Sequence, residues 1–327
     1  MNPIDGNHFS SARLQPLFLR KQQAQNSSRS MAIAFGYLLM LTAAEVLTTI
    51  FAPQASVALY SFLVMQYVLM LVLLLVQTAV SRKRKDHRLW LTLTIVPILR
   101  IVSFSLPLAT FHLMYWYLII SVPVFIGAIL ILRQLGFSWR DVGINGRNRL
   151  WQIPLFFSGL LIGYAEYLIL RPNSLVEGLG WAHVIAAALI LLISTGFLEE
   201  LIFRRMLQQV AVDQWGRAFG IVYVAAIFGV LHVGYSSFLD VAFVFGIGLF
   251  FGWAADKTGS IVGVTLAHGL ANITLFLILP ALGFADNALV IPHTFWYTLQ
   301  EYGIWMLLLM AGFGLMRLMV IEPQMLD

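Results

Sequence analysis

Long apolar stretches recur along the whole chain and are separated by short polar segments. Each stretch is long enough to cross about 30 Å of hydrocarbon as a helix. The polar segments carry Pro, Gly, Asn or charge, as in SRKRKDHR at 81–88. No stretch alternates apolar and polar residues as a membrane barrel would. The pattern therefore predicts an all-α, polytopic integral membrane helical bundle of about ten transmembrane helices, at 31–51, 57–80, 89–109, 112–132, 149–170, 181–203, 218–235, 238–255, 260–282 and 294–317.

Composition supports this prediction. Of the 327 residues, 60% are hydrophobic and 11% are charged, whereas a soluble domain carries about 25% charged residues. A soluble protein of this length could not cover its surface with so few charged residues. The lipid bilayer is therefore the expected environment and partner of the chain. The chain has no Cys, which excludes disulfides, thiolate nucleophiles and Cys-ligated metals.

The distribution of basic residues predicts an orientation. With ten spans and a cytosolic N-terminus, 18 of the 20 Lys and Arg residues fall in predicted cytoplasmic segments. Arg171 falls in an outer loop, and Arg100 falls inside the third span. The net charge of +5 is thus explained by topology, and no nucleic-acid partner is expected. We expect a multi-pass protein of the plasma (cytoplasmic) membrane with both termini in the cytosol.

The chain divides into four parts by chemistry. Residues 1–30 are polar and read as a disordered cytosolic tail, and residues 31–170 read as lipid-facing transmembrane helices with few polar groups. Residues 181–282 concentrate the polar groups that lie at membrane depth, and residues 283–327 hold the last transmembrane helix and a short tail. Inserting a charged side chain at the bilayer centre costs about 2.5–3.5 kcal/mol of free energy. Each charged group at membrane depth is therefore expected to have a structural or chemical role.

Two adjacent carboxylates stand out in the segment STGFLEELIFRRML at 194–207. Glu200 and Arg204 are four residues apart, so they share a helix face and can pair. Glu199 lies about 100° around the helix axis from Glu200, so its side chain can face a different neighbour. We therefore expect a structural role for Glu200 and Arg204, and a chemical role for Glu199.

Two further pairs have the same four-residue spacing. Phe228 and His232 lie in AIFGVLHVGYSS, and His268 and Asn272 lie in TGSIVGVTLAHGLANITLF. Each pair shares one helix face, and the Phe228 ring can shield the imidazole of His232 from solvent. The neighbouring small residues let helices approach closely, which would bring Glu199, both histidines and Asn272 together.

These three motifs resemble those of the CAAX-protease and bacteriocin-processing (CPBP) family, which includes CAAX prenyl endopeptidases and Abi-type bacterial membrane proteins. The resemblance covers about residues 181–280 and includes the segment Thr258-Gly259-Ser260. Family members usually have Gly after the motif Arg, where this chain has Arg205. The resemblance implies that residues 181–282 form a catalytic helical core. It also implies an intramembrane endopeptidase acting on membrane-associated peptides or proteins, with or without a lipid modification.

Peptide hydrolysis needs a captured water, a base and donors for the oxyanion. We expect Glu199 to be the base, His232 to hold the same water, and His268 and Asn272 to stabilise the oxyanion; the resemblance implies the same roles. This mechanism uses no cofactor. The alternative is a metal enzyme in which Glu199, His232 and His268 bind Zn²⁺ or another divalent ion, although the chain has no HExxH motif.

Two other functions stay open at the level of sequence. A non-catalytic immunity or scaffold protein could keep the same fold. An ion-coupled transporter could use Glu45, Glu166, Glu199 and the two histidines as an ion path, although no internal repeat is visible. Glu45 and Arg100 fall at comparable depth, and we favour a structural pair between them over a proton path.

Overall fold

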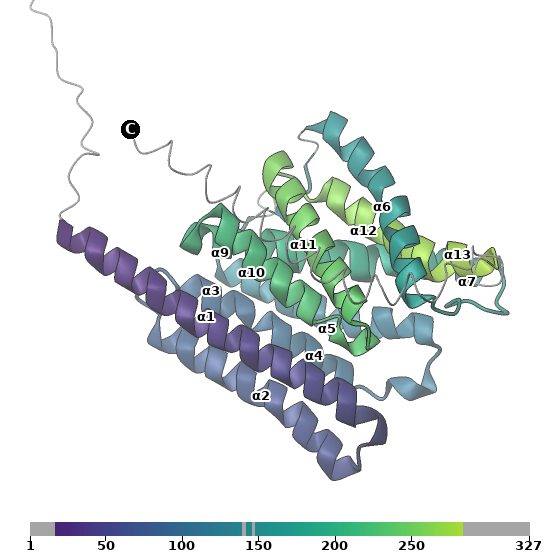
Figure 1. Ribbon diagram of the computed structural model, residues 1–327, viewed down its shortest axis with the longest axis horizontal. Coiled ribbons are helices and arrows are strands. Elements are labelled where there is room, and N and C mark those ends of the chain that lie inside the picture. Colours follow the sequence, from purple (N-terminus) through teal and green to yellow (C-terminus); the bar gives the residue numbers. More distant parts are fainter. Residues whose placement is uncertain (1–16, 139–141, 146–147, 284–327) are drawn as a thin grey trace, which may run out of the picture.

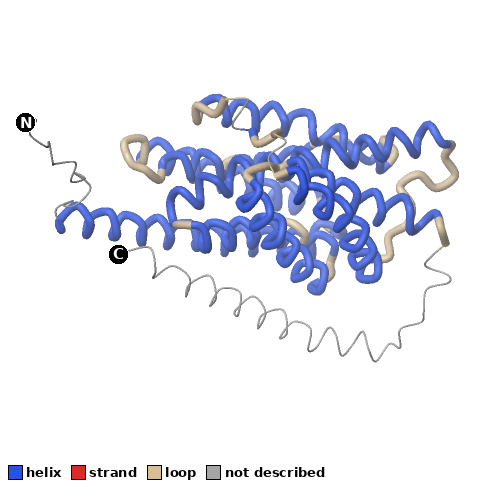
Figure 2. The backbone as a smooth tube through the Cα atoms, turned by 90° about the horizontal axis from the view of Figure 1, so that it is seen from above, coloured by secondary structure: helices blue, strands red, loops and turns tan. Residues whose placement is uncertain are grey.

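The computed structural model describes residues 17–138, 142–145 and 148–283. Every regular element among them is helical (Figures 1 and 2). Nine helical segments in this part of the chain are long and apolar enough to cross a membrane, so the predicted membrane bundle is confirmed. The tenth predicted span, at 294–317, lies outside the described residues.

The nine candidate spans follow the predicted order closely. Among the first five spans, four are uninterrupted helices: α1 (Leu17–Phe51), α2 (Val57–Val80), α5 (Leu113–Gln134) and α6 (Arg149–Leu170). Two short helices, α3 (His87–Leu93) and α4 (Ile95–Ser105), make up the third span. The later spans contain α7 (Trp181–Ile190), η4 (Leu191–Phe197), α8 (Leu198–Glu200), η5 (Leu201–Leu207), α9 (Gln208–Trp215), α10 (Arg217–Val230), η6 (Val233–Tyr235), α11 (Phe238–Thr258), α12 (Val262–Ile273), η7 (Thr274–Ile278) and α13 (Leu279–Ala281).

The prediction of a disordered tail over residues 1–30 is wrong for its second half. Helix α1 begins at Leu17, fourteen residues before the predicted span at 31 (31 minus 17). The polar sequence LRKQQAQ lies inside this helix, and such residues form helices well without being apolar. Hydropathy detects only the part of a helix that lies in lipid.

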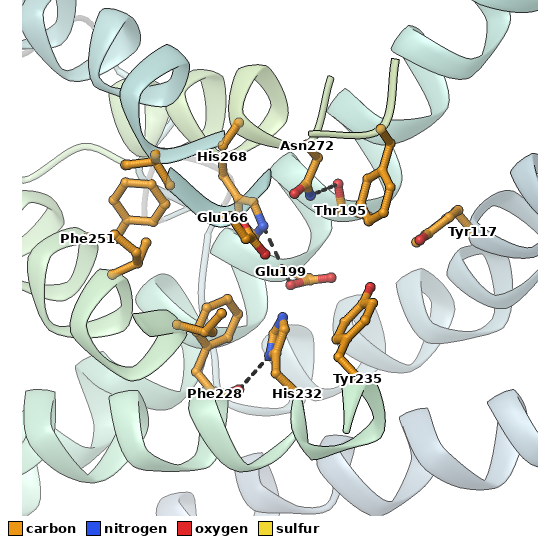
Figure 3. A pocket seen from close by; sticks show the side chains of 15 residues that line it. Tyr117, Glu166, Thr195, Glu199, Phe228, His232, Tyr235, Phe251, His268 and Asn272 are labelled. Carbon is orange, nitrogen blue, oxygen red and sulfur yellow. Dashed lines mark hydrogen bonds and ion pairs between the residues drawn. The ribbon is translucent and has the colours of Figure 1, made fainter. Parts of the chain in front are cut away.

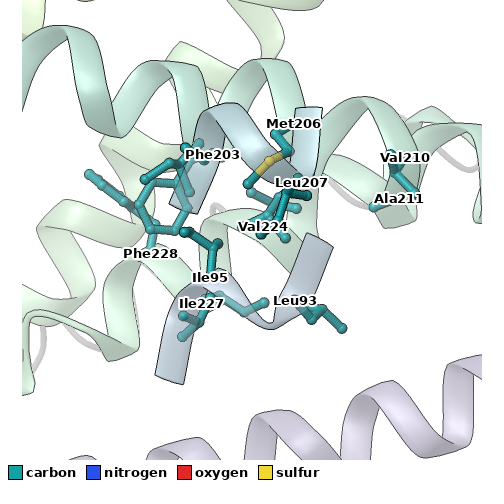
Figure 4. Packing of buried hydrophobic residues seen from close by; sticks show 14 of the residues in the cluster. Leu93, Ile95, Phe203, Met206, Leu207, Val210, Ala211, Val224, Ile227 and Phe228 are labelled. Atoms are coloured by element: carbon teal, nitrogen blue, oxygen red, sulfur yellow. The ribbon is translucent and has the colours of Figure 1, made fainter. Parts of the chain in front are cut away.

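The N-terminal helices do more than face lipid. Side chains of α3 and α4 belong to the same buried cluster as side chains of η5 and α10; it includes Leu93, Ile95, Met206, Val224 and Ile227 (Figure 4). Residues 31–170, which were expected to face lipid, therefore also form one wall of the core that holds the candidate site.

Glycine allows the closest helix contacts in the C-terminal half. A Cβ atom on Gly163 of α6 would lie 2.3 Å from the carbonyl oxygen of Ala271 in α12, and one on Gly159 would lie 2.3 Å from that of Ala267. A Cβ atom on Gly196 of η4 would lie 2.9 Å from the backbone nitrogen of Gly269. Only residues without side chains permit this approach, so α6 and η4 both lie directly against α12 (Figure 1).

The span from Trp181 to Trp215 is one long helix with two wide turns. The π-helical segments η4 and η5 stand on either side of α8, which contains Glu199 and Glu200. Such segments are rare and often occur at functional sites. The two carboxylates are therefore presented by an irregular part of an otherwise regular membrane helix.

Candidate active site

Glu199 and Glu200 point to different surroundings. Glu200 is fully buried, and its carboxylate lies 3.1 Å from Nε of Arg204. This confirms the pair expected from their spacing. The side chain of Glu199 retains 28% of its exposure and lines two adjoining cavities. One carboxylate is thus neutralised within its own helix, and its neighbour is left accessible.

His232 follows the last turn of α10 and is oriented by its own helix. Its Nδ1 lies 2.8 Å from the carbonyl oxygen of Phe228, so Nδ1–H donates and Nε2 is left to face the cavity. The Phe228 ring lies 4.9 Å from the imidazole, between centroids, and the guanidinium of Arg204 lies 4.9 Å above the same ring. Phe228 therefore covers one side of His232, as its spacing predicted.

His268 is held by a carboxylate that the sequence had assigned only to Arg204. Its Nδ1–H donates to Oε1 of Glu200 at 2.9 Å, and its Nε2 lies 3.8 Å from Oε2 of Glu199. One helical turn further along α12, the amide of Asn272 donates to Oγ1 of Thr195 at 2.8 Å. The bond to Glu200 fixes the ring orientation of His268 and leaves its Nε2 free for a ligand.

The four predicted residues surround one cavity. Glu199, His232, His268 and Asn272 all line a space of about 60 Å³, and Figure 3 shows them converging from α8, the end of α10 and α12. A site of this size and polarity can hold a few water molecules. The close helix packing predicted from the small residues thus brings the four side chains together.

Four other polar residues of the cavity were not assigned to the site from sequence. They are Tyr117, Glu166, Thr195 and Tyr235 (Figure 3). Thr195 lies four residues before Glu199, which is a local signal that helix spacing could have given. Glu166 was visible as a charge inside a span, but only the contact of α6 with α12 shows where it points.

A second cavity adjoins the first and is lined by the N-terminal helices. It has a volume of about 180 Å³ and shares Tyr117, Thr195 and Glu199 with the first. Its walls are mainly apolar side chains of α4, α5 and the Glu199 helix. Glu199 therefore lies where a small polar space meets a larger apolar one.

Arg100 joins this second cavity to the N-terminal helices. Its Nε and Nη2 each donate to the carboxylate of Glu45 at 2.7 Å, which confirms the expected pair. Nη2 also donates to the carbonyl of Leu231, directly before His232. The pair therefore ties α1 and α4 to the turn that carries a site histidine.

The sequence left open that Glu199, His232 and His268 bind a divalent metal ion. Within the described part of the chain, no three His, Asp or Glu side chains are arranged as a metal-binding group. Nδ1 of His268 is bonded to Glu200, so Nε2 is the ring nitrogen left for a ligand.

Comparison with known proteins agrees with the motifs. Residues 181–274 match the family model described as type II CAAX prenyl endopeptidase Rce1-like. No curated protein and no solved structure matches the chain. The matched region contains all four residues that converge on the cavity, together with Glu200, Arg204 and Phe228. Over these residues, which are less than a third of the chain, the protein is similar to type II CAAX prenyl endopeptidases of the Rce1-like family.

Proposed function

We propose that this protein is an intramembrane endopeptidase that hydrolyses a peptide bond of a membrane-associated peptide or protein. One observation carries the proposal: a carboxylate, two imidazoles and a carboxamide from three helical segments line one cavity large enough for a few water molecules. The family match supports the reaction class. The membrane location of the cavity supports a substrate that is itself held by the bilayer.

In the proposed mechanism Glu199 is the general base. It takes a proton from a water molecule, and the water oxygen attacks the scissile carbonyl carbon. His232 accepts a hydrogen bond from the same water through Nε2, because its Nδ1–H is committed to the carbonyl of Phe228. Positioning the water in line with the carbonyl carbon lowers the activation free energy, because the entropy of bringing the reactants together is lost on binding and not in the reaction step.

His268 and Asn272 serve as donors to the oxyanion that forms on the carbonyl oxygen, and His268 donates through Nε2–H as an imidazolium because its Nδ1–H is held by Glu200. They are one turn apart on α12, and both line the cavity. Glu200 fixes the ring of His268, and Thr195 fixes the amide of Asn272. Donors that are held before the reaction lower the barrier most, because little reorganisation is needed.

We propose that the reaction needs no metal ion. The test is metal analysis of the purified protein together with chelator treatment. Full peptide hydrolysis without stoichiometric metal supports the glutamate mechanism. Loss of hydrolysis on chelation, with recovery on Zn²⁺ addition, would replace it with the zinc mechanism.

We further propose that the protein lies in the cytoplasmic membrane with both termini in the cytosol. The clustering of basic residues in alternate loops supports this orientation. The substrate is then a peptide or protein of that membrane, and the family description suggests a prenylated cysteine near its C-terminus.

The proposed activity can be tested with purified protein in liposomes. The probes are an internally quenched peptide with a prenylated cysteine followed by three residues, and the same peptide without the prenyl group. We expect wild-type protein to cleave at least one of them and Glu199→Gln to cleave neither. In parallel, proteomics of membrane fractions from cells with wild type or Glu199→Gln should show substrates that accumulate uncut. Equal cleavage and equal proteomes would overturn the proposal.

A further inference from the structure

Glu166 is a carboxyl group in the catalytic cavity that no motif includes. It lies on α6, outside the matched residues 181–274. Its side chain lines the cavity beside His268 and Glu199 (Figure 3), and only 9% of the residue is exposed. The contact of Gly163 with Ala271, one turn earlier on α6, is what brings it there.

No cation neutralises Glu166 among the described residues. The groups that act on it most strongly are Asp240 on α11, His268 on α12 and Glu199 on α8. Two of these are acidic, and His268 is already bound to Glu200. The phenols of Tyr117 and Tyr235 also face the cavity. A carboxylate without a partner at such a site costs several kcal/mol, and a group in this position takes up a proton instead.

We propose that Glu166 is the general acid of the proposed peptidase, protonating the leaving amine. The inference rests on the proposed function. After the water oxygen bonds to the carbonyl carbon and Glu199 takes a proton, the carbon–nitrogen bond breaks. The nitrogen receives the proton of Glu166, and the amine leaves. Glu199 then returns its proton to Glu166 through cavity water, which restores both groups.

The positions of the carboxyl groups support this division of work. Glu199 lies at the border of the two cavities, whereas Glu166 lies on the opposing helix α6 and lines only the polar cavity. Asp240 cannot replace it, because both carboxylate oxygens of Asp240 are fully buried and Asp240 does not line the cavity. Two carboxyl groups held in unlike surroundings are the usual arrangement for a base and an acid.

The protonation of Glu166 can be measured without any substrate. Infrared difference spectra of liposome-embedded wild type minus Glu166→Gln should contain the carbonyl band of a protonated carboxyl at neutral pH. Glu177→Gln is the matched control, because Glu177 is exposed in the loop after α6 and its difference spectrum should lack that band. Absence of the band for Glu166 overturns the proposal, whatever the activity of the protein.

The donor role can be separated from a structural role by the leaving group. A thiolate leaves without a proton, whereas an amine needs one. For the cleaved probe peptide, we expect Glu166→Gln to lower kcat by about 10²-fold with little change in KM. For the same peptide with a thioester at the scissile position, the loss should be below about threefold. Glu166→Asp should keep within about tenfold of wild type, and Glu177→Gln should equal wild type.

Each result has one meaning. Equal losses on the amide and the thioester show a structural role and overturn the proposal. A rise in KM alone shows that Glu166 binds a cationic group of the substrate, and this also overturns it. Failure of wild type to cleave any probe rejects the proposed function together with the donor role, and the infrared band still reports whether Glu166 holds a proton.

Discussion

Two carboxyl groups inside the membrane, Glu45 and Glu166, are treated in opposite ways by the fold. Glu45 receives two hydrogen bonds from Arg100 at 2.7 Å and one from the hydroxyl of Tyr67 at 3.1 Å. Glu166 has no hydrogen bond or ion pair among the described residues and faces a cavity. The first acid is neutralised and holds helices together. The second is buried without a partner among the described residues, which costs stability unless the carboxyl group is protonated.

The same contrast separates the adjacent residues Glu199 and Glu200. Glu200 contacts both Arg204 and His268 and is completely buried, whereas Glu199 opens onto two cavities. Partners, more than depth, therefore distinguish a structural acid from a chemical one in this protein. Substitutions that exchange or remove partners test this distinction.

The largest effect is expected from Glu199→Gln. The variant keeps the shape of the side chain and removes the base, so peptide hydrolysis in liposomes should fall by about 10⁴-fold. Thermal unfolding in detergent should change little, because Glu199 neutralises no buried cation by itself. A variant that retains more than a tenth of wild-type hydrolysis would show that Glu199 is another structural acid.

Arg100→Met should act on stability instead. It leaves Glu45 buried without its cation and removes the donor to Leu231, so the free energy of unfolding should fall by about 3–5 kcal/mol. Reversible unfolding in mixed micelles measures this loss. The double variant with Glu45→Gln should recover part of it, because no charge is then left unpaired. No recovery in the double variant would mean that Glu45 and Arg100 are not coupled.

Gly163→Ala tests the contact that brings Glu166 to the cavity. The added Cβ would lie 2.3 Å from a backbone oxygen of α12, so the helices must separate. We expect a loss of about 1–3 kcal/mol in stability. Gly36→Ala is the matched control, because nothing lies within 4 Å of a Cβ at that position; it should be neutral or slightly stabilising. Equal effects of the two changes would refute the close contact.

The smallest effect should come from Thr195→Val. Asn272 loses the acceptor of its side-chain amide while the volume stays nearly constant, so kcat on the probe peptide should fall about fivefold, or about 1 kcal/mol. Thr195→Ser keeps the hydroxyl and should stay close to wild type. If Val and Ser behave alike, the hydroxyl does not position Asn272.

Much of the fold could be predicted because lipid imposes a simple rule on sequence. The predicted spans at 57–80 and 149–170 coincide with α2 and α6, since a helix in lipid must be apolar along its whole length. The start of α1 at Leu17 was missed because its first turns are polar. The π-helical turns were missed because a wide turn depends on how the helix packs against its neighbours, and residue spacing within one span does not report that packing.

The site was predictable where its residues share one helix face. Glu200 with Arg204, and Phe228 with His232, are neighbours by spacing alone, and the structure places each pair in contact. The bond between Glu200 and His268 joins residues 68 positions apart, and local spacing cannot predict it. Glu166 was missed for the same reason, since its place depends on how α6 packs against α12.

The wide turns η4 and η5 decide where the Glu199 helix can lose a residue. A π-helical turn takes up about one residue more than an α-helical turn. Deleting a single residue of η4 such as Ile193, which is exposed on the bundle surface, converts the wide turn to an α-helical one and keeps the direction of both carboxylates. Deleting a residue from the regular turns of α7 would instead rotate the two sides of the helix against each other by about 100°. The helix should therefore tolerate the loss of one residue in η4 far better than in α7.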